Sequence, residues 1–207
     1  MLEILGRASS INVRKVLWLC DELGVSWRRE DWGIGFRSPK EPEFLALNPN
    51  ALVPVIRDGS FVLWESHAIL RYLARKHRAR HLLPDDLEPL AIVEQWMDWA
   101  ATELTKAWRG VFLGLVRPTP GFTEPERIAA ATADWTDKMR MLDIHLDASG
   151  GFMTGGAFTL ADIPVGLTVH RWYASPIERP DLPAVAAYYE RLSERPPFVE
   201  HGREGGP

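Results

Sequence analysis

Glu65 and Ser66 open a helical stretch and have side chains suited to binding an amino-acid head group. The apolar residues Ile69, Leu70 and Leu73 recur after them with helical spacing, which places Ser66 at a helix N-terminus. Free N–H groups and the positive end of the helix dipole bind a carboxylate at such a position, and the Glu65 carboxylate can take the matching ammonium. The alternative interpretation is that both residues only cap the helix.

A second feature, Val53-Pro54, points to a peptide-like ligand. Pro54 leads the apolar run through Ile56 and belongs at the start of its strand, because proline cannot donate to a sheet ladder. Its place after a tight turn makes it a candidate cis-proline. The backbone N–H and C=O of Val53 would then face outward and hold an extended peptide as an added strand does.

Ser10 lies between an apolar strand and the helix that follows it. A hydroxyl at this position can donate to a sulfur anion, and the helix N-terminus adds to the effect. Both lower the pKa of a bound thiol, and the thiolate is the form that reacts as a nucleophile. A plain helix cap is the alternative interpretation, and it is compatible with the first because the dipole acts at the cap.

Strands and helices alternate in the first part of the chain and must position these residues. The sequence predicts strands at Leu2–Leu5 and Val25–Trp32 around a helix at Ile11–Leu23. A short helical turn, Glu43–Leu47, precedes two strands joined by an Asp58-Gly59 hairpin. This order, β-α-β, an irregular helix and then β-β-α, is typical of a thioredoxin-like domain.

The second part of the chain is predicted to be helical throughout. A long helix is expected at Glu88–Val116, with Thr123–Ala148 as its antiparallel partner. Thr159 and Asp162 have the spacing of a capping box before another apolar helix, so Asp162 is assigned to folding. We therefore expect a domain at residues 1–78, a linker at 79–87 and an all-helical domain at 88–207, whose last stretch, EHGREGGP, is expected to fray.

The composition of the chain argues against several classes of protein. The net charge is −4, so a general nucleic-acid or anionic-membrane surface is not expected. No apolar run approaches the roughly 20 residues of a membrane span. Cys20 is the single cysteine, which allows no intrachain disulfide and favours the cytoplasm. No Cys/His cluster has metal-ligand spacing, so no metal is expected.

These motifs together resemble the glutathione transferases over nearly the whole chain. The stretch from Asn48 to Arg75, NPNALVPVIRDGSFVLWESHAILRYLAR, is similar to the glutathione-binding segment of that family. In the family a cis-proline follows an Asn-Pro pair, and a Glu-Ser pair opens the next helix. The resemblance implies that Glu65 and Ser66 hold the γ-glutamyl end of glutathione, while Val53 and Pro54 present backbone groups to the tripeptide.

The turn that carries Ser10 has the pattern S-x-x-V-R-K-V-L, which is similar to the first turn of serine-type and related bacterial members. The resemblance implies that the Ser10 hydroxyl stabilises the thiolate. Asn12 is the competing candidate, because some bacterial subgroups use an asparagine amide near the sulfur. The turn has no tyrosine, and Cys20 falls on the apolar stripe of the helix, so tyrosine-type and cysteine-type members are not favoured.

The resemblance also assigns residues around the two ends of the ligand. The family often supplies a cation for the glycine carboxylate from the loop that here carries Arg37 and Lys40. Arg109 would suit an anionic electrophile, such as a carboxylate-bearing halide. Core packing is the alternative for the aromatic stripe at helical spacing. The electrophile site is expected at Arg7, Trp108, Arg109 and Phe112.

The resemblance implies a glutathione transferase with an α/β, thioredoxin-like N-terminal domain and an all-α C-terminal domain. Such an enzyme activates glutathione, its co-substrate, as a thiolate for attack on a small electrophile. The alternatives are a glutathione-dependent disulfide reductase and a non-catalytic glutathione-binding or regulatory protein on the same fold. We expect a cytoplasmic homodimer that binds neither nucleic acid nor membrane.

Overall fold

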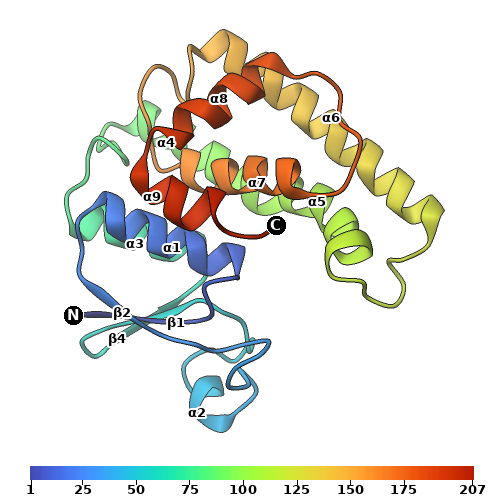
Figure 1. Ribbon diagram of the computed structural model, residues 1–207. Helices are drawn as coiled ribbons and strands as arrows, with labels where there is room; N and C mark the ends of the chain where they lie inside the picture. Colours follow the sequence, from blue (N-terminus) through green and yellow to red (C-terminus); the bar gives the residue numbers. More distant parts are fainter. The chain divides into compact units, whose positions relative to one another are not determined.

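The computed structural model describes residues 1–207, which divide into two compact units (Figure 1). Residues 1–83 and 197–205 form the first unit, and residues 84–196 and 206–207 form the second. The division at residue 83 falls inside the predicted linker at 79–87. The predicted extent of the helical domain, 88–207, differs from this grouping because residues 197–205 pack with the first unit.

A four-stranded mixed sheet forms the centre of the first unit. Its strand order is β2-β1-β3-β4. β1 pairs in parallel with β2, while the pairs β1–β3 and β3–β4 are antiparallel. This arrangement confirms the predicted thioredoxin-like order and hairpin. The strands are β1 (Leu2–Leu5), β2 (Trp27–Glu30), β3 (Val55–Asp58) and β4 (Phe61–Trp64).

Three helices cover this sheet. α1 (Ile11–Glu22) and α3 (Ser66–Lys76) lie side by side on one face, and α2 (Pro42–Leu45) lies on the other (Figure 1). On the α2 face, the buried rings of Phe44 and Trp32 lie with their centroids 5.0 Å apart. Apolar side chains therefore fill both faces, which fixes the loops at the carboxyl end of β1.

The turn from β1 into α1 depends on Gly6. Its φ is +148°, and a Cβ at this position would lie 2.5 Å from Cγ2 of Val13, so only glycine fits. The backbone N–H of Gly6 donates to the carbonyl of Glu30 at 2.8 Å, and that of Arg7 donates to the carbonyl of Trp32 at 3.1 Å. These contacts fix the approach to the N-terminus of α1.

Residues 197–205 return to the first unit and pack on α1. The ring of Phe198 lies 4.9 Å from that of Trp18, and Nε2 of His201 lies 2.5 Å from Oδ2 of Asp21. These residues belong to α9 (Pro196–Phe198) and to the π-helical segment Val199–Arg203. The expectation that EHGREGGP frays is wrong for residues 200–205, because the π-helical turn and the buried His201 hold them against α1.

The second unit contains only helices and connecting loops. The predicted long helix is observed, but two π-helical segments, Ala100–Leu104 and Phe112–Val116, interrupt its regular winding. A π-turn inserts one residue into a helix and changes the spacing of apolar residues too little for the turn to be predicted from the sequence. None of the helices combines the length and apolar composition that crossing a membrane requires. The helices are α4 (Leu87–Trp99), α5 (Thr105–Val111), α6 (Pro125–Ser149), α7 (Asp162–Ala174) and α8 (Pro183–Ser193).

Asp162 ties together the loop before α7. Its carboxylate accepts hydrogen bonds from the backbone N–H of Met153 at 2.9 Å and of Thr159 at 2.7 Å, and from the Tyr188 hydroxyl at 3.1 Å. Burial raises the pKa of Asp162 to about 6, although its hydrogen bonds act in the opposite direction. These partners are structural groups, which supports the assignment of Asp162 to folding.

Changing Asp162 to Ala is expected to lower the free energy of unfolding by about 3 kcal/mol, because buried N–H and O–H donors lose their acceptor. Urea unfolding followed by circular dichroism measures this change. Asp147→Ala on α6 is the matched control, since Asp147 is exposed, and should shift stability by less than about 0.5 kcal/mol. Equal stability of the two variants would contradict the assignment.

Candidate functional site

The predicted Glu65-Ser66 pair lies at the N-terminus of α3. Ser66 is the first helical residue and is buried, while Glu65 is exposed. Glu65 has φ +73°, a conformation that costs a residue with a side chain on the order of 1–3 kcal/mol and occurs mainly at functional sites. Its side chain makes no capping hydrogen bond. The Glu65 carboxylate therefore remains available to a ligand.

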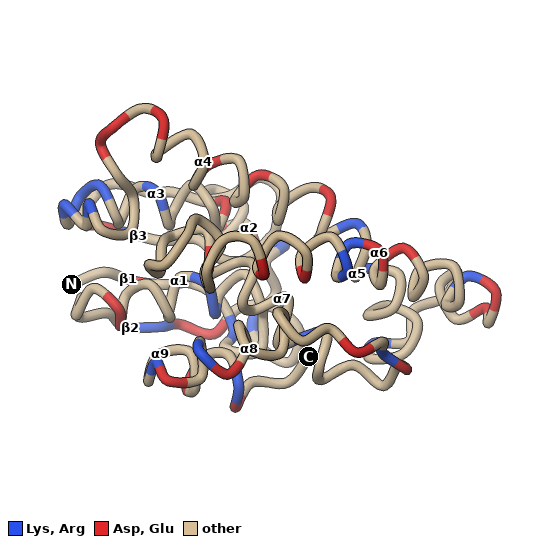
Figure 2. Tube along the Cα trace, turned by 90° about the horizontal axis from the view of Figure 1, so that it is seen from above, with Lys and Arg blue, Asp and Glu red and all other residues tan.

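The N-terminus of α3 is electrostatically open to an anion. The first intrahelical bond joins the N–H of Ile69 to the carbonyl of Glu65, so the N–H of Ser66 lies at the helix end and takes no part in the intrahelical ladder. No acidic residue follows in the first turn, while Arg75 and Lys76 occupy the last. Figure 2 shows blue, basic stretches of the trace beside the α3 label. Because the first turn carries no acidic residue, the positive end of the dipole has no counter-charge within the helix.

The loop before β3 has the predicted cis peptide bond between Val53 and Pro54. β3 begins at Val55, so the N–H and C=O of Val53 lie outside the strand ladder. The buried Asn48 holds this loop: its Nδ2 donates to the carbonyl of Leu52 at 2.8 Å. The Val53 backbone is thereby fixed in a position that a peptide can pair with.

The N-terminus of α1 carries the two candidates for thiolate stabilisation. Ser10 is the N-cap, with φ −82° and ψ 122°, but its side chain makes no capping hydrogen bond. Its hydroxyl is therefore not used by the helix. The neighbouring Ser9 accepts a hydrogen bond from Arg7 at 3.0 Å, which places Arg7 in this turn of the first unit.

Asn12 connects the N-termini of α1 and α3. Its Oδ1 lies 3.5 Å from Oγ of Ser66 and 3.0 Å from Nζ of Lys15. Nζ of Lys15 also lies 3.0 Å from Nε2 of His67. Sequence reasoning missed both Lys15 and His67. The available signal was a pair of charged residues, Arg14 and Lys15, within the otherwise apolar run from Val13 to Cys20.

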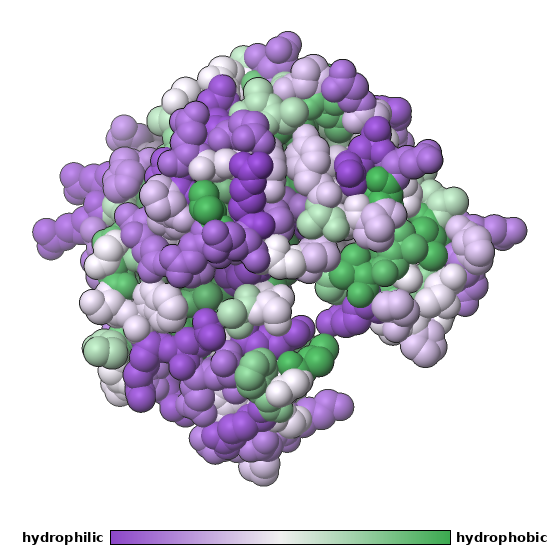
Figure 3. All heavy atoms as spheres, viewed as in Figure 1, coloured by the Kyte–Doolittle hydropathy of each residue, from purple (hydrophilic) through white to green (hydrophobic).

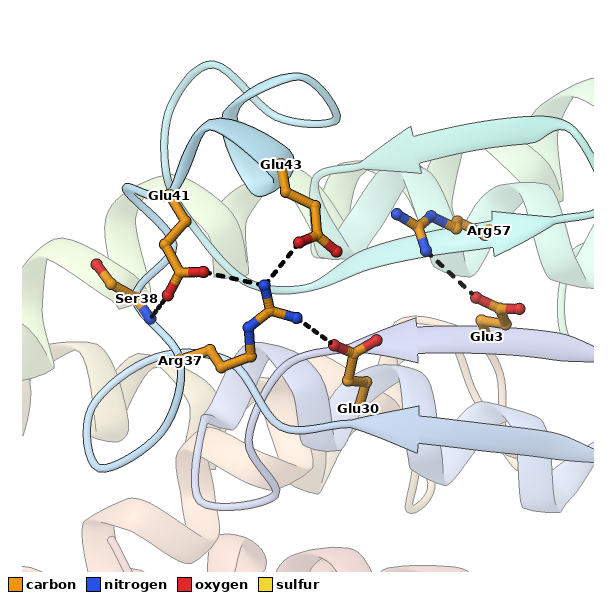
Figure 4. Close-up of polar contacts among 7 residues, drawn as sticks. All are labelled: Glu3, Glu30, Arg37, Ser38, Glu41, Glu43 and Arg57. Atoms are coloured by element: carbon orange, nitrogen blue, oxygen red, sulfur yellow. Dashed lines mark hydrogen bonds and ion pairs between the residues drawn. The ribbon is translucent and has the colours of Figure 1, made fainter.

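The two predicted cations for the glycine carboxylate have different surroundings. The Arg37 guanidinium contacts the carboxylates of Glu30, Glu41 and Glu43 at 3.1, 2.9 and 2.6 Å (Figure 4). The hydrogen bond with Glu43 contributes most to raising the pKa of Arg37. Lys40 is exposed and forms no ion pair. Lys40 is thus the better placed of the two to attract a further anion.

In the helical unit, Trp108 and Phe112 share a partner that the sequence did not indicate. Their ring centroids lie 5.7 Å apart in an edge-to-face arrangement. The guanidinium of Arg171, which is 2% exposed, lies 4.2 Å from each centroid. Cation–π contacts therefore fix both half-buried rings, whereas Arg109 is exposed. The only sequence signal was an arginine within the apolar helix α7.

A groove of about 590 Å³ also lies in the helical unit, lined in part by Leu115, Ile128 and Ile177. Apolar surface gathers over the end of the α5 region and the loop that follows (Figure 3). Leu115, which follows Trp108, Arg109 and Phe112 in the predicted apolar stretch, is the one candidate of the electrophile site that lines this groove.

Asp21, Glu200 and His201 are the one group of possible metal ligands, with ligand atoms within 4.8 Å of one another. Both carboxylate oxygens of Asp21 are already used: Oδ1 accepts from the Trp27 indole at 2.8 Å, and Oδ2 contacts His201. These contacts hold residues 197–205 on α1, and they account for the group without an ion.

Cys20 is fully buried on α1, as its place on the apolar stripe predicts. Burial raises the pKa of its thiol to about 12, with a smaller effect from Asp21. The thiol is therefore neutral and shielded at physiological pH, which does not suit a nucleophile.

A thioredoxin-like unit with a cis-proline loop and an anion-accepting helix N-terminus, followed by an all-helical unit, defines the glutathione transferase fold. Residues 9–76 match the family "Glutathione S-transferase, N-terminal domain". Glutathione S-transferase GstB of Escherichia coli (strain K12) is 34% identical over 198 residues, which are 95% of both chains. Glutathione S-transferase 3 of Zea mays is 32% identical over 95% of this chain and 91% of its own.

A solved structure of this family has the same fold. The theta class glutathione S-transferase from Xanthomonas axonopodis pv. citri, with glutathione bound, superimposes with a TM-score of 0.91 and 39% identity, over 97% of this chain and 96% of that one. This chain therefore belongs to the glutathione S-transferase family and is an enzyme of that family. The predicted family, fold class and class of activity are confirmed.

Cys20→Ala is expected to keep glutathione-dependent activity within about twofold of the wild type, because a buried neutral thiol takes no part in the chemistry. Turnover with a chromogenic electrophile measures this activity. In the native wild type, a thiol reagent should label Cys20 only after denaturant is added. Rapid native labelling together with loss of activity in the variant would reverse this interpretation.

Proposed function

We propose that the first unit binds glutathione across the N-termini of α1 and α3 and the Val53-Pro54 loop. The α-carboxylate of the γ-glutamyl residue binds the backbone N–H and the hydroxyl of Ser66, and its ammonium binds the Glu65 carboxylate. The Val53 backbone pairs with the cysteinyl residue. The observation that supports this most is Glu65, held at φ +73° with a side chain that caps nothing.

The sulfur of glutathione then lies at the N-terminus of α1, next to Ser10 and Asn12. Donors there stabilise the thiolate over the thiol and lower the pKa of the bound thiol, as the helix dipole also does. The thiolate forms a bond to the electrophilic carbon, the leaving group departs with the bonding electrons, and the thiol proton passes to solvent. Glutathione is consumed as a co-substrate, and no metal takes part.

The remaining groups complete the proposal. Lys40 or Arg37 attracts the glycine carboxylate, and Lys40 has the charge available. Side chains of the helical unit supply the electrophile site, with Trp108 and Phe112 as apolar walls held by Arg171. Arg7, which donates a hydrogen bond to Ser9 on the first unit, is proposed as a further residue of the electrophile site. The protein acts as a cytoplasmic homodimer with no nucleic-acid or membrane partner.

Ser66→Ala should weaken glutathione binding about ten- to a hundredfold, because a hydrogen bond to a carboxylate is lost. Isothermal calorimetry on the wild type and the variant measures this Kd. Ser60→Ala, an exposed serine in the turn between β3 and β4, is the control and should bind as the wild type does. Failure of the wild type to bind glutathione would overturn the proposed binding site.

Arg109→Ala should lower kcat/KM for a carboxylate-bearing halide about tenfold and leave a neutral halide nearly unaffected, because only the anion loses a charge partner. Steady-state kinetics with the two electrophiles measures the ratio. Lys106→Ala, which removes another exposed cation of α5, is the control. Equal losses for both electrophiles would remove Arg109 from the choice of substrate.

A further inference from the structure

Lys15 is a buried cation that bridges the N-terminal turns of α1 and α3. Its side chain comes from α1 and is 6% exposed, and its Nζ lies 3.0 Å from both Oδ1 of Asn12 and Nε2 of His67. Asn12 is exposed at the N-terminus of α1, and His67 is buried beside Ser66 in α3. A charge in this position needs a reason, because removing an ammonium from water costs free energy that its partners must offset.

The ammonium decides which way the Asn12 amide faces. An ammonium can only donate hydrogen bonds, so the atom of Asn12 that it contacts must be the oxygen. The Nδ2 group then lies on the other branch of the planar amide. Its two donors have no partner within the protein, and the side chain is exposed.

Ser66 alone does not fix this orientation. Its Oγ lies 3.5 Å from Oδ1 of Asn12, at the limit of a hydrogen bond, and a hydroxyl can donate or accept. With Ser66 as its only neighbour the amide could turn over and present its oxygen to the ligand. An amide oxygen repels a thiolate, whereas an amide N–H stabilises one. The orientation that Lys15 imposes therefore determines the sign of the interaction.

We propose that Lys15 is a positioning residue that holds the Asn12 amide with its N–H groups toward the sulfur of glutathione. The inference rests on the proposed glutathione site and selects Asn12 as a donor to the thiolate. Ser10, whose hydroxyl is likewise unused by the helix, is an additional donor. Lys15 and Asn12 lower the thiol pKa, whereas Ser66 and the Val53 backbone bind the rest of the tripeptide. Glutathione binding and thiol activation can therefore be measured separately.

A buried charge could also act on the thiolate directly through space, and a double-mutant cycle separates the two effects. Lys15→Met removes the donor and the charge but keeps a side chain of similar length. If Lys15 acts through Asn12, Lys15→Met has no effect in an Asn12→Ala background. If its charge acts directly, the effect of Lys15→Met persists in that background.

The experiment measures the thiol pKa of bound glutathione from thiolate absorbance against pH, together with the glutathione Kd by calorimetry. Lys15→Met and Asn12→Ala should each raise the thiol pKa by about one unit, the size expected when a hydrogen bond to an anion is lost. The double variant should match Asn12→Ala, and the Kd should change less than about threefold in all three. Lys15→Arg, which retains donors, should restore most of the shift, and Lys106→Met should leave the thiol pKa unchanged.

An unchanged thiol pKa in Lys15→Met, or additive shifts in the double variant, would overturn the role of Lys15 while leaving the glutathione site intact. Absence of glutathione binding by the wild type would instead overturn the proposed function itself. If Lys15→Met does not fold, the side-chain amide resonances of Asn12 in the wild type decide the question. They should shift when glutathione binds and shift far less with S-methylglutathione, which cannot form a thiolate; equal shifts would refute the proposal.

Discussion

The first unit depends on two helix N-termini that meet at one point. α1 and α3 direct the positive ends of their dipoles to the same place, marked by the contact of 3.5 Å between Oδ1 of Asn12 and Oγ of Ser66. Lys15 adds a full positive charge beneath this contact. Two dipole ends and an ammonium repel one another, so the site is incomplete without anions. The proposed ligand, glutathione, would supply two anions, its γ-glutamyl carboxylate and its thiolate.

The backbone around this point is held by groups outside the proposed site. Asn48 fixes the loop that presents Val53, and Gly6 lets the chain pass close to Val13 before α1 begins. The strained conformation of Glu65 is maintained because the strand before it and the helix after it are both packed into the unit. Rigid elements thus position the side chains and backbone groups of the proposed site.

The sequence predicted the local motifs well, because each depends on residues within a few positions of one another. The Val53-Pro54 bond, the Glu65-Ser66 helix start and the Asp162 loop are all of this kind. The contact of Lys15 with His67 joins residues 52 positions apart, and that of Asp21 with His201 joins residues 180 apart. Such pairs depend on how elements pack, which periodicity does not reveal. Arg171 was missed for the same reason.

The docking of residues 197–205 on α1 has a consequence for how the chain is made. The first unit draws its pieces from both sides of the helical unit in the sequence. During synthesis, residues 1–83 leave the ribosome long before Phe198 can cover Trp18. The first unit therefore cannot complete its packing on α1 until the entire helical unit has been translated. The two units are consequently distinct in structure but linked in their order of folding.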